Sequence, residues 1–327
     1  MSTLDNIRKP IASDLEAFDK YVAGEFQSEN PLVDIMLRDA MSSRGKGVRP
    51  ILVMLCAALN SPVGVVSRRA WVAAMMVEMI HVASLIHDDV IDSADTRRGK
   101  PSLNAIWQSK RAVLTGDYIL AKNLSIGLSS GQFDIVSHVV KAIAILCEGE
   151  VIQDDCARRQ AMTREEYLRI ITKKTASLLS ISASAGAMAA GASAKQIEQM
   201  RYFGEAVGMA FQIQDDILDY TPTANTGKPL NNDLREGKIT LPLLAVLERA
   251  DDALKQKIMA LLAECSVDDD AIAQLQQIVD SHGGVAFSRE VMGAYIDKAT
   301  AILSNYPDSE YRTALMNLCV FITQRDN

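Results

Sequence analysis

Paired cysteines and a surplus of basic charge are both missing from this chain, and each absence excludes a class of protein. The five cysteines are scattered and show no C-x-x-C spacing, so neither a disulfide framework nor a zinc site is indicated. The formal net charge is −7, whereas nucleic-acid binding needs a concentrated basic face. We therefore expect a cytoplasmic protein with no nucleic-acid partner.

Long uncharged stretches are also scarce. Charged residues such as Asp5, Arg8, Lys9 and Asp14 recur near the start, which excludes the apolar core of a secretory signal. Residues 175–194 do run without a charge over nearly the length that a bilayer requires, but serine, glycine and alanine dominate them. Small residues of this kind allow close helix packing, so we expect a buried helix and no transmembrane segment.

No strand-like alternation of comparable length interrupts the helical periodicity of the chain. Apolar residues recur with helical spacing in segments 11–26, 32–41, 50–59, 68–92, 112–128, 134–158, 164–190, 194–220, 241–249, 252–265, 269–281, 285–304 and 309–324. No interdomain linker and no internal repeat separates them. The pattern predicts an all-α protein, a single domain over residues 1–327 with about a dozen helices.

An acidic pattern occurs twice, as Asp-Asp-Val-Ile-Asp at 88–92 and as Asp-Asp-Ile-Leu-Asp at 215–219. On a helix, Asp88 and Asp92 lie one turn apart on one face, and so do Asp215 and Asp219. Their repulsion calls for a counter-ion, and carboxylates without cysteine or histidine ligands suit Mg²⁺ together with substrate phosphate oxygens. The alternative, that acidic pairs mark solvated helix ends, is less plausible for two copies that both follow apolar runs.

Each acidic pattern ends an apolar segment. Residues 71–92 are apolar almost all round, as a helix at the centre of a bundle would be, and residues 206–220 have the same design. Basic residues accompany both patterns and could neutralise the oxygens of a polyanion that metals do not reach, although each alone also fits a solvated surface charge. These residues are Lys46, Arg49, Arg97, Arg98, Lys174, Lys228, Arg235 and Lys238.

In these motifs the chain resembles the trans-isoprenyl diphosphate synthases (polyprenyl synthetases), over nearly its whole length. The motifs that carry the resemblance are G-K-x-x-R-P at 45–50, the first acidic pattern followed by Arg97-Arg98-Gly99, Lys174-Thr175, F-Q-I-Q-D-D at 211–216 with Asp219, Gly227-Lys228, and Asp233-Leu234 with E-G-K-x-T-L-P at 236–242. One departure is Asn231, where the family usually has glycine. Asparagine tolerates left-handed backbone geometry, so we expect the loop to keep its shape.

The resemblance implies the isoprenoid synthase fold, with helices around a central cavity, and a head-to-tail prenyltransferase. Such an enzyme condenses isopentenyl diphosphate with an allylic diphosphate such as farnesyl diphosphate, uses two or three Mg²⁺ ions, and is normally a homodimer. Matched by motif, the metal ligands would be Asp88, Asp92 and Asp215, supported by Asp89, Asp216 and Asp219. The allylic diphosphate would contact Arg97, Lys174, Lys228 and Lys238, and isopentenyl diphosphate would be held by Lys46, Arg49, His81 and Arg98. The allylic cation would face the side-chain dipoles of Thr175 and Gln212.

Product length in the family depends on residues just before the first motif, where bulky aromatic side chains close the pocket. Here Ala83 and Ser84 hold those places, with Ile80 deeper on the same helix. Only 5% of residues are aromatic and 14 are methionine, which suits a flexible apolar tunnel. We expect a long all-trans product of the octaprenyl or solanesyl type, used for quinone side chains. Close helix packing is another reason for small residues, and it leaves a shorter geranylgeranyl product open.

Several other functions compete with this interpretation. Glu78-x-x-His81 is half of a di-iron signature, but no second copy exists. His87 is more plausibly a hydrogen-bonded helix-end residue than a metal ligand, and residues 153–155 resemble a solvated helix end. A terpene cyclase would carry a different second metal motif. A non-catalytic partner subunit of a heteromeric synthase also remains possible, although all the motifs are intact.

Overall fold

A computed structural model describes residues 3–42, 45–159, 161–221 and 231–324, and nearly all of them are helical. The chain divides into two compact units. Unit 1 comprises residues 1–144, 178–204 and 302–318, and unit 2 comprises residues 145–177, 205–301 and 319–327. The all-α prediction is confirmed, whereas the prediction of a single domain stays a prediction.

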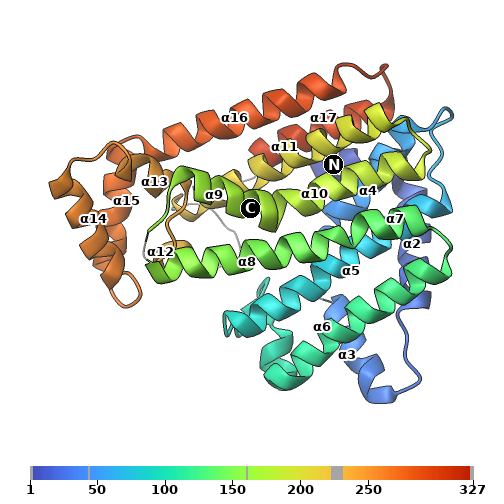
Figure 1. The fold of residues 1–327 in the computed structure, drawn as a ribbon, viewed down its shortest axis with the longest axis horizontal. Coiled ribbons are helices and arrows are strands. Elements are labelled where there is room, and N and C mark those ends of the chain that lie inside the picture. Colours follow the sequence, from blue (N-terminus) through green and yellow to red (C-terminus); the bar gives the residue numbers. More distant parts are fainter. Residues whose placement is uncertain (1–2, 43–44, 160, 222–230, 325–327) are drawn as a thin grey trace. The chain divides into compact units, whose positions relative to one another are not determined.

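The first half of the chain supplies most of unit 1 (Figure 1). Its elements are α1 (Thr3–Arg8), η1 (Lys9–Ile11), α2 (Ala12–Glu25), α3 (Pro31–Ser42), α4 (Val48–Asn60), α5 (Arg68–Ile91), β1 (Thr96–Arg97), β2 (Lys100–Pro101), α6 (Leu103–Ser129) and α7 (Phe133–Val139).

The second half of the chain supplies most of unit 2 and also part of unit 1. Its elements are α8 (Lys141–Arg159), α9 (Arg164–Ile171), the π-helical turn η2 (Thr172–Ala176), α10 (Ser177–Ala189), α11 (Ala194–Asp219), α12 (Asn232–Arg235), α13 (Leu241–Leu247), α14 (Asp252–Glu264), α15 (Asp269–Ser281), α16 (Gly284–Leu303) and α17 (Glu310–Thr323). The unit boundaries fall inside α8, α11, α16 and α17 and at the start of α10.

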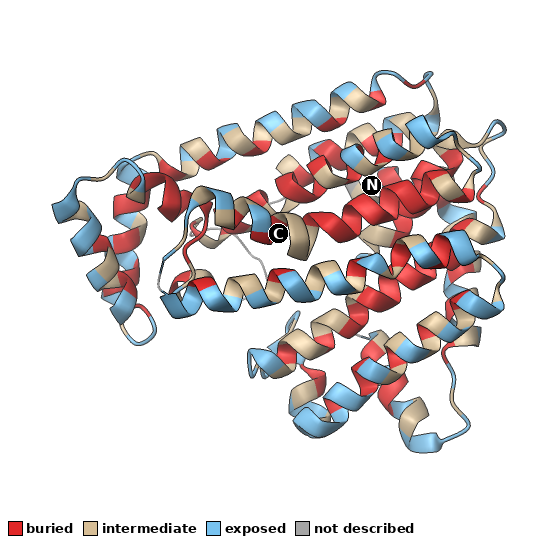
Figure 2. Cartoon of the chain, in the orientation of Figure 1, coloured by how far each residue is buried: buried red, intermediate tan, exposed pale blue. Residues whose placement is uncertain are grey.

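Helix α5 is the core of unit 1. It packs against α4, α6 and α7, and most of it is buried (Figure 2). By length and composition it could cross a membrane, but 72% of its apolar window is buried inside the protein. It is therefore a core helix, as its apolar composition on all sides predicts. Helix α10 is also buried, which confirms the expectation for the uncharged segment that contains it.

A short β-hairpin follows α5 and was not predicted. Strands β1 and β2 pair antiparallel, with Thr96 opposite Pro101 and Arg97 opposite Lys100. Arg98 and Gly99 form the turn with φ of 55° and 74°. Positive φ at both central residues is what a tight two-residue hairpin turn requires. The hairpin is too short for strand periodicity, and it separates Arg97, on a strand, from Arg98, in the turn.

Helix ends differ from the predicted ones in three places. The segment predicted at 134–158 is two helices that meet at Val140, and α6 begins at Leu103, well before residue 112. The segment predicted at 164–190 contains the π turn η2. The extra residue of a π turn leaves the apolar periodicity of its flanks intact, so the sequence pattern does not reveal it.

Candidate active site

The last turn of α5 carries the first acidic motif, and its three aspartates are not equivalent. Asp92 caps the helix and is exposed, Asp88 is half-buried, and Asp89 is only 3% exposed. The Nε and a terminal nitrogen of Arg97 both donate to one oxygen of Asp89, the Nε bond being 2.8 Å long. Burial raises the pKa of Asp89, and the bonds and charge of Arg97 oppose that shift. Asp89 thus positions the hairpin through Arg97.

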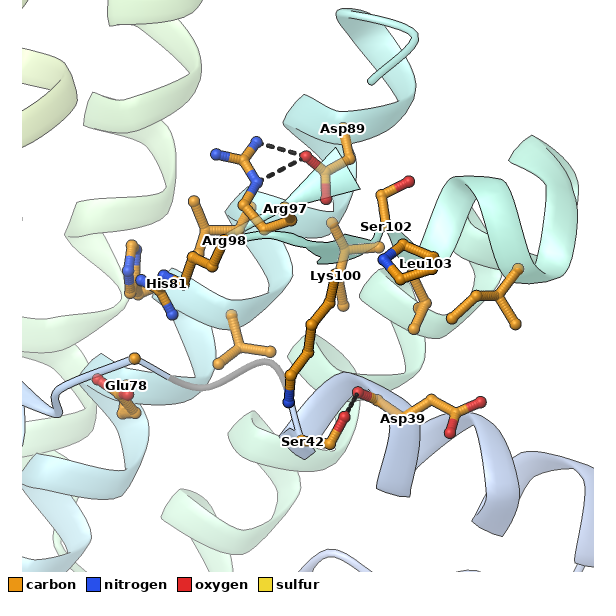
Figure 3. Close-up of a pocket in the computed structure, with 16 residues that line it drawn as sticks. Asp39, Ser42, Glu78, His81, Asp89, Arg97, Arg98, Lys100, Ser102 and Leu103 are labelled. Atoms are coloured by element: carbon orange, nitrogen blue, oxygen red, sulfur yellow. Dashed lines mark hydrogen bonds and ion pairs between the residues drawn. The ribbon is translucent and has the colours of Figure 1, made fainter. Parts of the chain in front are cut away.

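A cavity of about 170 Å³ lies beside this ion pair, and Figure 3 shows the side chains that line it. Helix α5 contributes Glu78 and His81, and the hairpin contributes Arg98. At Gly45 an added Cβ would lie 2.5 Å from the Arg98 guanidinium, so only glycine fits there without moving that group. The cavity thus brings together Gly45 of the G-K-x-x-R loop, His81 and the paired arginines, which lie far apart in the sequence.

Arg49 lies near His81, which lines this cavity. The Nε of Arg49 is buried without a hydrogen-bond partner among the described residues, although the residue as a whole keeps some exposed surface. Burial lowers the pKa of Arg49 to about 10, and the charge of Glu78 opposes that shift. Burial and the nearby arginines, with Arg49 first among them, lower the pKa of His81 well below its usual value. His81 is therefore neutral at pH 7, and the positive charges that act on it are those of Arg49, Arg97 and Arg98.

Other predicted positions of unit 1 lie near these residues in the chain. Lys46 is exposed, and its carbonyl accepts a hydrogen bond from Arg8. The Nε2 of His87 lies 3.4 Å from the carbonyl oxygen of Val113 and 3.5 Å from a carboxylate oxygen of Asp117, as expected of a hydrogen-bonded helix-end histidine.

The proposed chain-length positions differ in exposure. Ala83 is fully buried and Ile80 is 2% exposed, whereas Ser84 is half-buried and its hydroxyl donates to the His81 carbonyl at 2.9 Å. Of the three, Ser84 is the most exposed.

In unit 2 the second acidic motif lies at the end of α11. As in the first motif, the middle aspartate is buried and the two outer aspartates are more exposed. Asp215 and Asp219 are half-buried, and Asp216 is 2% exposed. Asp216 accepts from the Tyr167 hydroxyl at 2.5 Å on one oxygen and from the Gln212 amide at 2.8 Å on the other. Burial and the charge of Asp233 raise the pKa of Asp216 well above its usual value.

The π turn η2 presents Lys174 and Thr175. The Lys174 ammonium lies 2.5 Å from a carboxylate oxygen of Glu150 and donates to Gln153 at 3.0 Å. The Thr175 hydroxyl donates to the Gln212 carbonyl oxygen at 2.6 Å.

Two glycines allow helices to approach the turn closely. A Cβ at Gly149 would lie 2.9 Å from Lys174 Cγ, and one at Gly208 would lie 2.4 Å from Ala176 Cα. Larger residues at either position would displace η2.

The loop after α11 holds the last predicted residues. Lys238 pairs with Glu236, and the backbone amide of Asp233 donates to Asp219 at 3.1 Å. Asn231 has φ of 61°, which confirms that asparagine takes up the left-handed geometry at this position. Lys228 lies outside the described residues.

Sequence reasoning missed four residues that contact the predicted ones. Glu78 was considered only as half of a di-iron signature, and Tyr167 carried no motif of its own. Glu150 and Gln153 bind Lys174 from α8, where residues 153–155 were interpreted as a solvated helix end. That interpretation fits the acidic pair beside Gln153, since Asp154 and Asp155 are 60% and 66% exposed and pair with arginines of their own helix.

Both acidic motifs provide only carboxylate oxygen atoms as possible metal ligands. Within the described part of the chain, no three histidine, cysteine, aspartate or glutamate side chains gather closely enough to hold a metal ion. Each motif places its two outer carboxylates on one face of the helix. The middle carboxylate is hydrogen-bonded to a side chain of another element. This donor set fits Mg²⁺, which takes one or two carboxylates and completes its shell with water and phosphate oxygens.

Comparisons with known proteins agree with these features. Heptaprenyl diphosphate synthase component 2 of Geobacillus stearothermophilus is 36% identical over 318 residues, which cover 97% of each chain. The crystal structure of a decaprenyl diphosphate synthase from Rhodobacter capsulatus superposes with a TM-score of 0.92 at 31% identity and covers 99% of each chain. A polyprenyl synthase from Caulobacter crescentus, solved with calcium and isoprenyl diphosphate, superposes with a TM-score of 0.90 at 29% identity over 99% of this chain and 98% of that one.

A sequence model of the polyprenyl synthetase family matches residues 30–279, which is most of the chain. Together with the helical fold and the paired acidic motifs, this match shows that the chain belongs to the polyprenyl synthetase family of prenyltransferases.

Proposed function

We propose that this protein lengthens an allylic diphosphate, such as farnesyl diphosphate, with isopentenyl diphosphate units. The C–O bond of the allylic diphosphate breaks and releases diphosphate, and the double bond of isopentenyl diphosphate forms a new C–C bond to the freed carbon. Loss of a proton then leaves a chain that is longer by one unit. The observation that carries this proposal is the cavity beside the last turns of α5, which His81, Arg97 and Arg98 line, together with the nearby Arg49, whose buried Nε has no hydrogen-bond partner among the described residues.

The charged side chains divide into two proposed diphosphate sites. Isopentenyl diphosphate would bind Arg49, Arg98, the neutral ring of His81 and Lys46. A partly buried guanidinium group next to a neutral imidazole favours an anion over a neutral ligand, because the anion compensates the desolvated charge. The allylic diphosphate would bind the remaining basic residues, which are Arg97, Lys174, Lys228 and Lys238.

We also propose two or three Mg²⁺ ions per active site, held by Asp88, Asp92 and Asp215 with support from the other motif aspartates. When bound, the metal would neutralise charge on the departing diphosphate. The oxygen-only donor set at both motifs supports this choice. The side chains of Thr175 and Gln212 would face the allylic cation with oxygen dipoles, and the apolar helices would keep water away from it.

We propose a long all-trans product, in the range from hexaprenyl to decaprenyl, which is used for quinone side chains. We also propose that the protein acts in the cytoplasm. The small side chains of Ala83 and Ser84 support an open pocket floor. The relative from Geobacillus stearothermophilus, a heptaprenyl diphosphate synthase component, is consistent with this range.

A homodimer is the proposed assembly. Helix α6 and the start of α7 expose Leu114, Leu128 and Phe133 at 54%, 52% and 64%. Large apolar side chains that are exposed in the single chain favour contact with a protein partner over contact with water. Light scattering after size-exclusion chromatography tests this proposal, and a monomer at micromolar concentration would contradict it.

The decisive test incubates the purified protein with farnesyl diphosphate, excess isopentenyl diphosphate and Mg²⁺, followed by mass spectrometry of the products. Products of six or more isoprene units are expected. Products of four or five units would support the shorter-chain alternative, with the pocket floor nearer Ile80. The Asp88→Asn variant should give no product, whereas the exposed Asp154→Asn variant is the matched control and should match the unmodified protein.

A second candidate is a synthase subunit that needs a partner protein. It is favoured by one observation, which is that the relative from Geobacillus stearothermophilus is named as component 2 of its enzyme. The same assay separates the two candidates. Folded protein that makes no product alone, but makes it after addition of an extract from its own source, would support the two-component enzyme.

A further inference from the structure

A chain of hydrogen bonds in unit 2 runs from the buried Tyr167 to the half-buried Thr175 hydroxyl. The hydroxyl of Thr175 donates to the Gln212 carbonyl oxygen, and the Gln212 amide donates to Asp216. Tyr167 donates to the other oxygen of Asp216. All four side chains belong to unit 2, and Tyr167 and Asp216 are 3% and 2% exposed.

The two donors to Asp216 set the orientation of this chain. The Gln212 amide nitrogen donates to one oxygen of Asp216, so the amide group of Gln212 faces Asp216. Its carbonyl oxygen then faces Thr175, and the single proton of the Thr175 hydroxyl is used in that bond. The lone pairs of Thr175 that remain point away from Gln212 and are available to a positively charged group.

Tyr167 is well placed to hold this arrangement. It lies on α9, whose first turn is fixed by a capping box between Thr163 and Glu166, and α9 packs against η2 and α13. Its hydroxyl occupies the oxygen of Asp216 that Gln212 does not use. The carboxylate is thereby held at both oxygens and cannot rotate away from Gln212 without breaking a bond.

We propose that Tyr167 is a positioning residue which, through Asp216 and Gln212, orients the Thr175 hydroxyl so that its lone pairs face the allylic cation. This inference rests on the proposed function. It also assigns Asp216 a role in orienting Gln212 in place of the supporting metal role that its motif implies.

A double-mutant cycle tests the proposal. Tyr167→Phe removes one hydroxyl and should lower kcat about tenfold, as loss of a hydrogen bond to a charged group does, with little change in the KM of either diphosphate. Thr175→Val removes the hydroxyl at the end of the chain. If Tyr167 acts through Thr175, the double variant should be no slower than Thr175→Val alone. The neighbouring Tyr295→Phe variant is the control and should retain full kcat.

A second variant keeps the test valid if Tyr167→Phe is poorly folded. Asp216→Asn offers an amide donor to Gln212, which allows the Gln212 amide to flip and Thr175 to become an acceptor. It should lower kcat while the Mg²⁺ concentration for half-maximal rate stays the same. A rise of tenfold or more in that concentration would show that Asp216 is a metal ligand and would overturn the proposal.

The outcomes separate this inference from the function on which it rests. Losses from Tyr167→Phe and Thr175→Val that multiply in the double variant would refute the inference alone, because the unmodified protein would still elongate its substrate. Failure of the unmodified protein to consume either diphosphate would refute the proposed function, and the inference would fall with it.

Discussion

Replacement of Gly208 with alanine is expected to displace the π turn that carries Lys174 and Thr175. The added methyl group would lie 2.4 Å from Ala176 Cα and 2.9 Å from Ala176 Cβ. Carbon atoms in contact are about 3.5–4.0 Å apart, so α11 and η2 would have to separate by about 1 Å. The obstacle is main chain, so no side-chain rotation relieves it.

The expected loss of activity is larger than the loss of stability. Overpacking in a core costs about 1–3 kcal/mol, and the better helix propensity of alanine returns about 1 kcal/mol of that. The free energy of unfolding should therefore fall by about 0–2 kcal/mol. A catalytic group moved by about 1 Å loses about a hundredfold in rate, so kcat should fall far more than the small change in stability suggests.

The control is Gly293→Ala in the same unit. An alanine Cβ there has no atom within 4 Å, so this variant should be as stable as the unmodified protein or slightly more stable, with unchanged kcat. Circular dichroism gives the Tm, and mass spectrometry of the products gives kcat. If Gly208→Ala keeps the kcat and Tm of the unmodified protein, the close packing of α11 against η2 does not constrain the turn, and the reasoning fails.

Three further predictions follow from the first unit. Asp92→Asn should lower turnover by orders of magnitude with an unchanged Tm, because the side chain is exposed; an equal loss in Asp154→Asn would contradict the metal role. Ser84→Phe should shorten the products seen by mass spectrometry, and an unaltered distribution would mean that the tail runs elsewhere. The pKa of His81 lies below its unfolded value, so the unfolded chain binds a proton that the folded chain excludes. Stability should therefore fall below about pH 6.5, by at most about 1.4 kcal/mol per pH unit, and the loss in Tm from pH 7 to 5 should be smaller in His81→Gln.

The helical fold was predictable because burial leaves a strong periodic signal. Most predicted segments match helices to within one or two residues, and α15 matches exactly at both ends. The β-hairpin and the π turn escaped prediction for a common reason, which is that each spans only a few residues and has no period of its own. Both features lie beside predicted site residues, so the local geometry of the site was the least predictable part of the fold.

The placement of the site residues was predictable only where helical spacing determines it. Spacing of four residues puts Asp88 with Asp92, and Asp215 with Asp219, on one face, whereas the next residue along the helix points about 100° away. That rotation directs Asp89 and Asp216 into the protein, where 3% and 2% of their surface remains exposed.

There each middle aspartate meets a partner from another element, which a helical pattern does not specify. Arg97 of β1 binds Asp89, and Tyr167 of α9 binds Asp216. The repeated acidic pattern therefore combines two functions in each copy. We propose that its outer aspartates bind a cation, whereas its middle aspartate holds a side chain of a neighbouring element, Arg97 in the first copy and Tyr167 in the second. A substitution at the middle position should therefore disturb neighbouring side chains before it disturbs metal binding, and a substitution at an outer position should do the reverse.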